Sequence, residues 1–358
     1  MATLTVTAEQ LTIHPHPNAD ALELAQVGLY RAVVAKGVYR TGDWALYIPE
    51  NAVLPEALIA EFGLTGKLAG AARNRVRHVR LRGELSQGIV CRPQVFAGID
   101  LSIAHAEGRN FAAELGITKW IPPVPVQLAG EVVQAPDLLR WIEIEDIKRY
   151  PDVFDSGEAI VATEKIHGSA CLYTWSENAS LVSSKGIGSR YLSIVDNGTN
   201  LYWRAVTAYD VPSAARQIAA LYSASRVGVF GEVYGKGVQD LSYDTSGGGT
   251  PGYAVFDIAV DVGDGRRWLS SSEVVDALDR IDVDLPTVPV LYAGPYDREL
   301  LLKLATGTET VSGAETHLRE GLVVRPAVER YSPILSGRAI AKFISPDYLT
   351  RKGGTEYE

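Results

Sequence analysis

The sequence predicts an α+β protein built from two domains. Its 358 residues exceed the usual length of one domain, so two domains are favoured. The first third of the chain holds short strand patterns at about ten-residue spacing, which favour a small barrel or sandwich. The remainder mixes strand and helix patterns, with few helices between the late strands, and this favours antiparallel sheets.

Composition limits the class of protein. Apolar residues make up 46% of the chain and charged residues 22%, which is enough for a sizeable core. The net charge of −9 argues against a protein that coats nucleic acid non-specifically, although it allows a local basic groove. We expect a cytoplasmic protein. The sequence has no signal peptide or membrane-length apolar run, and Cys91 and Cys171 lack the spacing of a zinc or disulfide framework.

Turn residues separate the predicted strands of the first domain. After "HPNAD", apolar residues alternate at Leu22, Leu24 and Val27, which is typical of a strand. Residues 30–55 contain two further strand patterns, and "LRGELSQGIVCRP" at 81–93 adds another.

A basic stretch, "RNRVRHVRLR", covers residues 73–82. Its first three arginines alternate and would share one face of a strand, and the whole set could follow a phosphate backbone. The alternative is a solvated edge strand that is blunted by charge. The candidate nucleic-acid-binding residues are Arg73, Arg75, Arg77, Arg80 and Arg82.

The segments "HPNAD", "GDWALYIPENAVLP" and "LRGELSQGIV" resemble the OB-type barrel of tRNA-binding modules over residues 8–95. This resemblance implies an N-terminal OB-like β-barrel at 1–120 that binds nucleic acid on one face. The proline-rich residues 121–139 are interpreted as a linker, so the second domain would span 140–358.

The second domain begins near Trp141 and shows clear element boundaries. Residues 212–223 have helical spacing, with Pro212 suited to a first turn. Ser270 and Glu273 form a capping-box pattern ahead of a helix. The segments "RVGVFGEVYG", "GYAVFDIAV", "EGLVVRP" and "AIAKFIS" are strand-like.

Several residues of this domain suit nucleotidyl transfer. A lysine such as Lys165 in "EKIHGS" is nucleophilic only when neutral, and burial or a nearby metal ion favours that form. Glu232 and Glu320 lie at strand ends, where they could hold the metal. Lys342 lies among apolar residues and would need an anion such as phosphate, and Phe256 could stack on a base. Together they fit a lysine–nucleotide phosphoramidate.

In chain order, "EKIHG", "SSKG", "FGEVYG", "YAVFDI", "REGLVV" and "AKFIS" resemble the motif series of covalent nucleotidyltransferases: DNA ligases, RNA ligases and mRNA capping enzymes. Lys-x-His-Gly is similar to RNA ligases, whereas the other two groups usually have Lys-x-Asp-Gly. The phrase "VQDLSYD" and the preceding OB-like module resemble one RNA ligase subclass. That subclass joins a 3′-OH to a 5′-phosphate and favours manganese.

The resemblance implies a set of nucleotide contacts. Lys165 would attack the α-phosphate of ATP and hold AMP. His167 and Gly168 would shape the turn beneath it, with His167 touching phosphate or metal-bound water. Glu164 would lie beside the adenine, and Phe256 would stack on it.

The resemblance also implies contacts to metal and phosphate. Lys185 would meet the incoming 5′-phosphate or the ribose. Glu232 would bind the ribose or metal-bound water, and Glu320 would help to hold Mn²⁺ or Mg²⁺ through water. Lys342 would contact the α-phosphate.

Two positions depart from the family pattern. Many ligases have Lys-x-Lys in the last motif, whereas the earlier position here is Ile340, so Arg338 or Lys185 would have to supply the missing charge. Ala170 stands where some RNA ligases carry an Asn or Arg that touches nucleotide or RNA, which puts that contact in doubt.

Taken singly, each candidate also fits a structural role. A strand lysine can be salt-bridged, a strand-end carboxylate solvated and a strand phenylalanine part of the core. These alternatives apply to Lys165, His167, Lys185, Glu232, Phe256, Glu320 and Lys342.

The sequence therefore predicts an ATP-dependent RNA ligase that seals 3′-OH and 5′-phosphate ends in RNA repair at nicks. It would act through lysyl-AMP on Lys165 and an adenylylated 5′ end. Its partner would be RNA or an RNA-containing duplex, with no membrane or protein partner implied. The alternatives are a capping-type nucleotidyltransferase that uses GTP and a non-catalytic RNA-binding protein. Ile340 keeps the last alternative open, whereas Lys165 and Glu232 argue against it.

Overall fold

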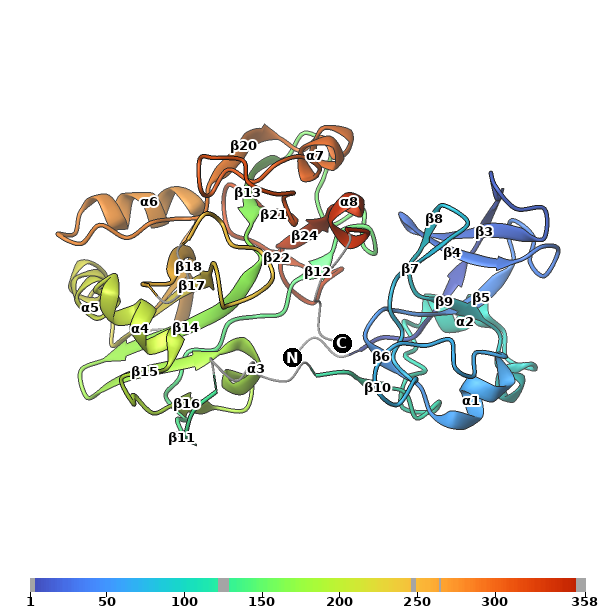
Figure 1. Cartoon of the computed structure of the whole chain (residues 1–358), viewed down its shortest axis with the longest axis horizontal. Coiled ribbons are helices and arrows are strands. Elements are labelled where there is room, and N and C mark those ends of the chain that lie inside the picture. Colours follow the sequence, from blue (N-terminus) through green and yellow to red (C-terminus); the bar gives the residue numbers. More distant parts are fainter. Residues whose placement is uncertain (1–3, 122–128, 246–248, 264, 352–358) are drawn as a thin grey trace. The chain divides into compact units, whose positions relative to one another are not determined.

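The computed structural model describes residues 4–121, 129–245, 249–263 and 265–351. Within these residues the chain forms two compact units. The N-terminal unit comprises residues up to 121 together with 148–151, and the C-terminal unit comprises 129–147 and 152–351 (Figure 1). Among the described helices, none has both the length and the apolar character needed to cross a membrane.

The N-terminal unit is built from short antiparallel strands, as the sequence predicts. One sheet has the order β1-β5-β9 and another the order β2-β3-β4, with the pairs β10-β6 and β7-β8 beside them. The helical segments are α1 (Glu56–Glu61), η1 (Gln94–Phe96) and α2 (Leu101–Ala106). The strands are β1 (Thr7–Gln10), β2 (Thr12–Pro15), β3 (Leu22–Val27), β4 (Tyr30–Ala35), β5 (Trp44–Ile48), β6 (Ala52–Val53), β7 (Val79–Leu81), β8 (Glu84–Ser86), β9 (Ile89–Cys91) and β10 (Thr118–Lys119).

Strand β5 shows how the alternating sequence builds this unit. Leu46 and Ile48 pack into one apolar cluster, whereas Ala45 and Tyr47 pack into another on the opposite face. Because both faces of β5 are covered, and β1 and β9 pair with its two edges, the strand is central to this unit.

The "HPNAD" motif supports the hairpin β7–β8. His16 is buried, and its Nε2 lies 3.2 Å from the carbonyl oxygen of Leu81. Asn18 Nδ2 donates to the carbonyl oxygen of Arg82 at 3.0 Å. The motif therefore holds the turn that carries the last arginine of the basic stretch.

A large antiparallel sheet dominates the C-terminal unit, in the order β11-β16-β15-β14-β17-β18-β19. Helices α4 (Leu201–Ala208), α5 (Val211–Tyr222) and α6 (Ser271–Asp279) pack on one face (Figure 1). Short helix α3 (Lys185–Gly188) follows β15. The strands are β11 (Val132–Gln134), β14 (Gly168–Ser176), β15 (Ala179–Ser184), β16 (Leu192–Ile194), β17 (Arg226–Tyr234), β18 (Gly252–Val262) and β19 (Gly265–Trp268).

Two helix starts follow the sequence prediction. Pro212 lies in the first turn of α5. Ser270 caps α6 by accepting from Glu273 N at 3.3 Å, and Glu273 Oε2 accepts from Ser270 N at 2.8 Å. The capping box is therefore complete.

A small sheet has the order β12-β24-β21-β13-β20, in which β12 and β24 run parallel. Helices α7 (Arg298–Ala305) and α8 (Pro346–Leu349) and the pair β22 (Tyr331–Ser332) and β23 (Gly337–Arg338) accompany it. Its strands are β12 (Glu145–Asp146), β13 (Ala159–Lys165), β20 (Val290–Pro295), β21 (Gly321–Pro326) and β24 (Ala341–Ile344).

The segment 121–139, expected as a linker, is only partly described, because residues 122–128 lie outside the described part of the chain. Its later part belongs to the C-terminal unit: β11 pairs with β16, and Leu138 and Leu139 are buried. Apolar side chains thus anchor this part of the segment. The domain boundaries at 120 and 140 stay a prediction.

Candidate active site

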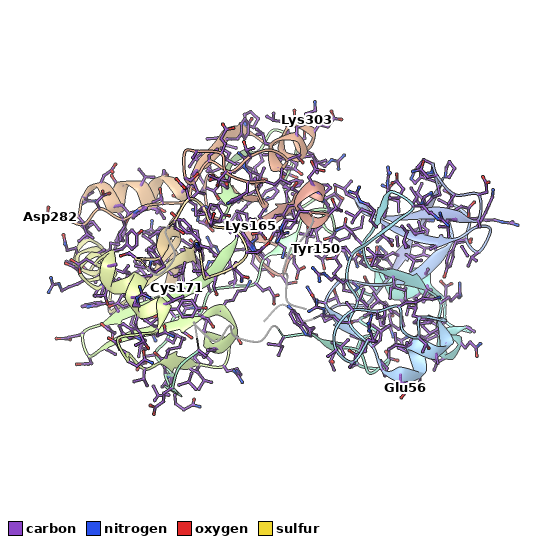
Figure 2. The ribbon with its side chains drawn as sticks, viewed as in Figure 1. Glu56, Tyr150, Lys165, Cys171, Asp282 and Lys303 are labelled. Carbon is purple, nitrogen blue, oxygen red and sulfur yellow. The ribbon has the colours of Figure 1, made fainter. Side chains whose placement is uncertain are left out.

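Lys165 ends β13 of the small sheet, and Gly168 begins β14 of the large sheet. The Lys-x-His-Gly motif is therefore the crossing between the two sheets. Figure 2 shows Lys165 among the strands of the C-terminal unit. A Cβ atom at Gly168 would lie 2.2 Å from the carbonyl oxygen of Val233, so only glycine allows this close approach of β14 to β17.

Lys165 is paired with Glu320, the residue that directly precedes β21. Lys165 Nζ lies 2.6 Å from Glu320 Oε1, and 24% of the lysine side chain remains exposed. The pairing follows from strand register, because Lys165 lies opposite Gly321. The amine is thus held in place and still reachable by a substrate.

Glu232 in β17 is partly exposed and lies opposite Ala170. Burial raises the pKa of Glu232 to about 8, the charge of Glu320 acts in the same direction, and Lys165 and Lys185 oppose the shift. A second positive charge near the two carboxylates would favour their ionised forms.

The donor atoms fit a hard divalent cation. Glu320 Oε2 is buried and has no hydrogen-bond partner among the described residues, and Glu232 adds a second carboxylate. In the described part of the chain, no group of three or more His, Cys, Asp or Glu side chains is arranged to hold a metal. We expect phosphate oxygens and water to complete the coordination of an ion.

His167 is held at both ring nitrogens. Nε2 lies 2.5 Å from Asp240 Oδ1, and Nδ1 lies 2.7 Å from the Tyr348 hydroxyl group. Arg351 NH2 donates to Asp240 Oδ2 at 3.0 Å. Although partial burial favours the neutral acid, His167 and Arg351 hold the pKa of Asp240 well below its usual range. Sequence reasoning missed Tyr348 and Arg351, and it noted Asp240 only within the phrase "VQDLSYD".

Backbone register places Lys342 on the same face of the small sheet as Lys165. Thr163 pairs with Val323, which in turn pairs with Lys342. Directly opposed residues share a face, as do residues two apart in one strand. Both lysines therefore project from this face.

Lys185 and Phe256 approach the site through Trp141. Lys185 Nζ lies 5.2 Å from the centroid of the Trp141 ring, and the Phe256 ring meets the same tryptophan edge-on at 4.7 Å. Phe256 is partly buried between two apolar clusters. Its contacts fit both the stacking role and the core role.

Glu164 does not extend its side chain to the same face as Lys165. It is buried, and its Oε2 accepts from Thr310 N at 2.9 Å and from Thr310 Oγ1 at 2.6 Å, with Arg319 Nε at 3.4 Å. One of its carboxylate oxygens is thus already engaged. The expected contact of Glu164 with adenine stays a prediction.

Arg338 does not supply the charge that Ile340 lacks. Its NH1 lies 2.5 Å from Asp257 Oδ2, and its NH2 lies 2.7 Å from Glu329 Oε1. Two carboxylates therefore neutralise the guanidinium. Asp257 is fully buried and also accepts from Trp141 Nε1 at 2.8 Å, a role that its sequence position does not signal.

The arginines of the basic stretch do not share one face. Arg73 lies in a turn with φ of 52°, and the strand β7 begins only at Val79. Arg75 is buried, and its guanidinium lies 3.9 Å from the centroid of Trp120. The expectation of a continuous strand from Arg73 to Arg77 is therefore wrong, whereas Arg80 and Arg82 are exposed on the hairpin.

The fold and the lysine-centred site define a ligase-type nucleotidyltransferase domain that follows an OB-fold domain. The family model described as RNA ligase matches residues 158–344, and a model of an OB-fold domain matches residues 4–93. Because the ligase match covers more than half of the chain, the protein belongs to the RNA ligase family.

Solved structures of Naegleria gruberi RNA ligase are similar in fold. A mutant with ATP and Mn is 22% identical, with a TM-score of 0.78, over 96% of this chain and 98% of that one. Another mutant with AMP and Mn is also 22% identical, with a TM-score of 0.79 over 96% of this chain and 98% of that one. The enzyme with PPi is 22% identical, with a TM-score of 0.78 over 97% of this chain and 98% of that one. A sequence comparison with curated proteins found no match.

Proposed function

We propose that this RNA ligase transfers AMP from ATP to Lys165 and then to an RNA 5′-phosphate. The observation that carries the proposal is the reachable Lys165 amine, 2.6 Å from Glu320 at the crossing of two sheets. The similar Naegleria gruberi structures contain ATP or AMP with Mn, or PPi, which supports ATP and a divalent metal as the reactants here.

The chemistry assigned to the chain's own residues begins at Lys165. Its neutral Nζ attacks the α-phosphorus of ATP and loses a proton as the N–P bond forms, the bond to the β-phosphate oxygen breaks, and pyrophosphate leaves. An RNA 5′-phosphate oxygen then displaces the lysine, which recovers a proton. The RNA 3′-OH finally attacks the activated 5′-phosphorus, loses its proton and releases AMP.

Positioning and charge neutralisation carry most of this reaction. Glu320 and Glu232 would hold the divalent cation, which when bound neutralises phosphate charge and stabilises the transition state. Lys342 shares a face with Lys165 and would hold the α-phosphate, and Lys185 would meet the incoming 5′-phosphate. His167 and Gly168 keep the crossing in shape.

We also propose that residues 1–120 bind nucleic acid and that residues 140–358 form the adenylyltransferase domain, joined through 121–139. The RNA ends would carry a 3′-OH and a 5′-phosphate, as at nicks in repair. A cytoplasmic location is supported by the free, buried cysteines Cys91 and Cys171.

The test is covalent labelling. Full-length protein is treated with pyrophosphate to remove any bound AMP, and then incubated with α-labelled ATP or GTP and Mn²⁺. A denaturing gel and peptide mapping follow, with Lys165→Ala as the control. We expect label from ATP alone, on Lys165. Label from GTP would favour the capping-type alternative, and no label with either nucleotide would overturn the proposal.

A further inference from the structure

A cluster of cationic and aromatic side chains surrounds α3. The Arg140 guanidinium lies 4.1 Å from the centroid of the Tyr191 ring, and Lys185 Nζ lies 5.2 Å from that of Trp141. Arg190 directly precedes Tyr191 in the chain, and its side chain is exposed. We call these five residues the Tyr191 patch. Among the described residues, no ion pair engages Arg140 or Arg190.

Tyr191 adopts a backbone conformation that a large side chain rarely takes. Its φ is 57°, in the left-handed region. The surrounding backbone enforces it, because Tyr191 N donates to Gly188 O at 2.9 Å and Ala135 N donates to Tyr191 O at 2.7 Å. Of the tyrosine surface, 39% stays exposed. Strained backbone conformations are common at functional sites. Here the strained residue places an aromatic ring at the surface, beside the guanidinium plane of Arg140.

The Tyr191 patch is continuous with the candidate active site. Trp141 contacts Phe256 edge-on at 4.7 Å, and its Nε1 donates to Asp257 at 2.8 Å. One end of the patch therefore reaches Phe256, which is assigned to the nucleotide, and the other end reaches the surface.

We propose that the Tyr191 patch binds unpaired nucleotides of an RNA strand, such as the frayed end at a nick, beside the reaction site. Bases stack on aromatic rings and on arginine planes, which Tyr191 and Arg140 present together. Lys185 and Arg190 match the phosphates of the same strand. In a chain with a net charge of −9, this local group of cations selects an anionic partner. The inference rests on the proposed function and names a binding surface for its RNA.

Tyr191→Gly is the sharpest test, because glycine adopts this φ without strain. The variant should unfold at the same or a higher temperature than the parent. If the Tyr191 side chain had a purely structural role, the variant would unfold at a lower temperature than the parent. Tyr191→Phe keeps the ring, and Tyr331→Ala removes a tyrosine that is 64% exposed elsewhere on the unit.

Fluorescence anisotropy with a short labelled single-stranded RNA measures Kd, and sealing assays measure KM for RNA. We expect Tyr191→Gly to raise both by about fivefold or more, as for the loss of one base–aromatic stack. Tyr191→Phe and Tyr331→Ala should match the parent, and lysyl-AMP formation should be unchanged in all three variants.

Two outcomes would overturn the inference: unchanged affinity of Tyr191→Gly for single-stranded RNA, or weaker binding confined to fully paired RNA. Failure of the parent to form lysyl-AMP would instead overturn the proposed function. The anisotropy measurement tests the Tyr191 patch in either case.

Discussion

The carboxylate of Asp240 lies 2.5 Å from Nε2 of His167, and the two residues are 73 positions apart in the chain. Asp240 accepts the Nε2 proton, which sets the orientation of the ring. The Tyr348 hydroxyl group contacts the other ring nitrogen, so the imidazole ring of His167 is held in a single orientation. His167 Nδ1 also lies 3.8 Å from Glu320 Oε2, which links this arrangement to the partner of Lys165.

Replacing Asp240 should therefore slow the first chemical step. We expect Asp240→Asn to lower the rate of lysyl-AMP formation by roughly tenfold or more, because a freed His167 no longer supports the site's geometry. Single-turnover labelling with ATP measures this rate. The matched control is Asp244→Asn, an exposed aspartate in the same loop. Equal rates for both variants would contradict the positioning role.

Gly168→Ala should distort the junction of the two sheets. The new Cβ would lie 2.2 Å from the Val233 carbonyl oxygen, so a strand must shift. We expect the free energy of unfolding to fall by about 1–3 kcal/mol. Urea denaturation measures it. Gly186→Ala is the control, because no atom lies within 4 Å of its added Cβ, and it should change stability by less than about 1 kcal/mol.

Asp257→Ala should be among the most destabilising changes in the C-terminal unit. It would leave the buried guanidiniums of Arg325 and Arg338 without this carboxylate, at a cost of about 3–5 kcal/mol. Urea denaturation is again the measurement. Asp276→Ala serves as control, since that carboxylate is 65% exposed and pairs with Arg280 at 3.5 Å. Similar losses for both variants would refute the importance of the buried network.

Glu158 gives a prediction for pH. Its hydrogen bonds with Arg330, at 2.6 and 2.8 Å, hold the pKa of Glu158 below its ordinary value. A lowered pKa adds stability above the unfolded-state pKa, and this stability is lost as pH falls through the folded-state pKa. Glu158→Gln should thus unfold at a lower temperature than the parent near neutral pH.

The two proteins should converge as pH falls from the ordinary pKa of a glutamate through the lower folded-state pKa of Glu158. Thermal unfolding followed by circular dichroism at several pH values tests this. Glu177→Gln removes an exposed carboxylate and should leave the parent's profile unchanged. A constant difference between parent and Glu158→Gln across the whole pH range would rule out the linkage.

The basic stretch yields a prediction that separates its members. Replacing Arg80 and Arg82 by Gln should weaken RNA binding and lower the slope of log K against log[salt] by about 1 per residue. Arg75→Gln should leave affinity unchanged and reduce stability by about 0.5–2 kcal/mol, because it removes the contact with Trp120. RNA titrations at several salt concentrations measure the affinity of each variant, and urea denaturation measures its stability. Together they separate a loss of RNA binding from a loss of stability.

Local patterns predicted much of the fold. The short strands and the capping box of α6 depend on residues close to an element boundary, where sequence carries a direct signal. The sequence also named Lys165 and Glu320 separately, but it did not indicate that the two side chains pair. Contacts across long separations carried no such signal. Tyr348 meets His167 across 181 positions, and its own neighbours in sequence indicate only a helix start.

The sequence also could not show which charged side chains are buried and already paired. Arg75 and Arg338 read as available cations, since nothing local distinguishes a solvated arginine from one that is stacked or paired. Their partners, Trp120 and Asp257, lie 45 and 81 positions away. Only the folded chain shows which arginines are already committed.

The short segment Lys148–Pro151 has a consequence for biosynthesis. It belongs to the N-terminal unit, where Leu29 N donates to Lys148 O at 2.7 Å and Arg149 pairs with Glu9 at 2.7 Å. A ribosome therefore has to deliver residue 151 before the first unit can make its last contacts. By then β11 and β12 of the second unit have also left the exit tunnel in sequence order. A gene fragment cut at residue 120 would therefore encode a first unit that lacks the contacts of residues 148–151.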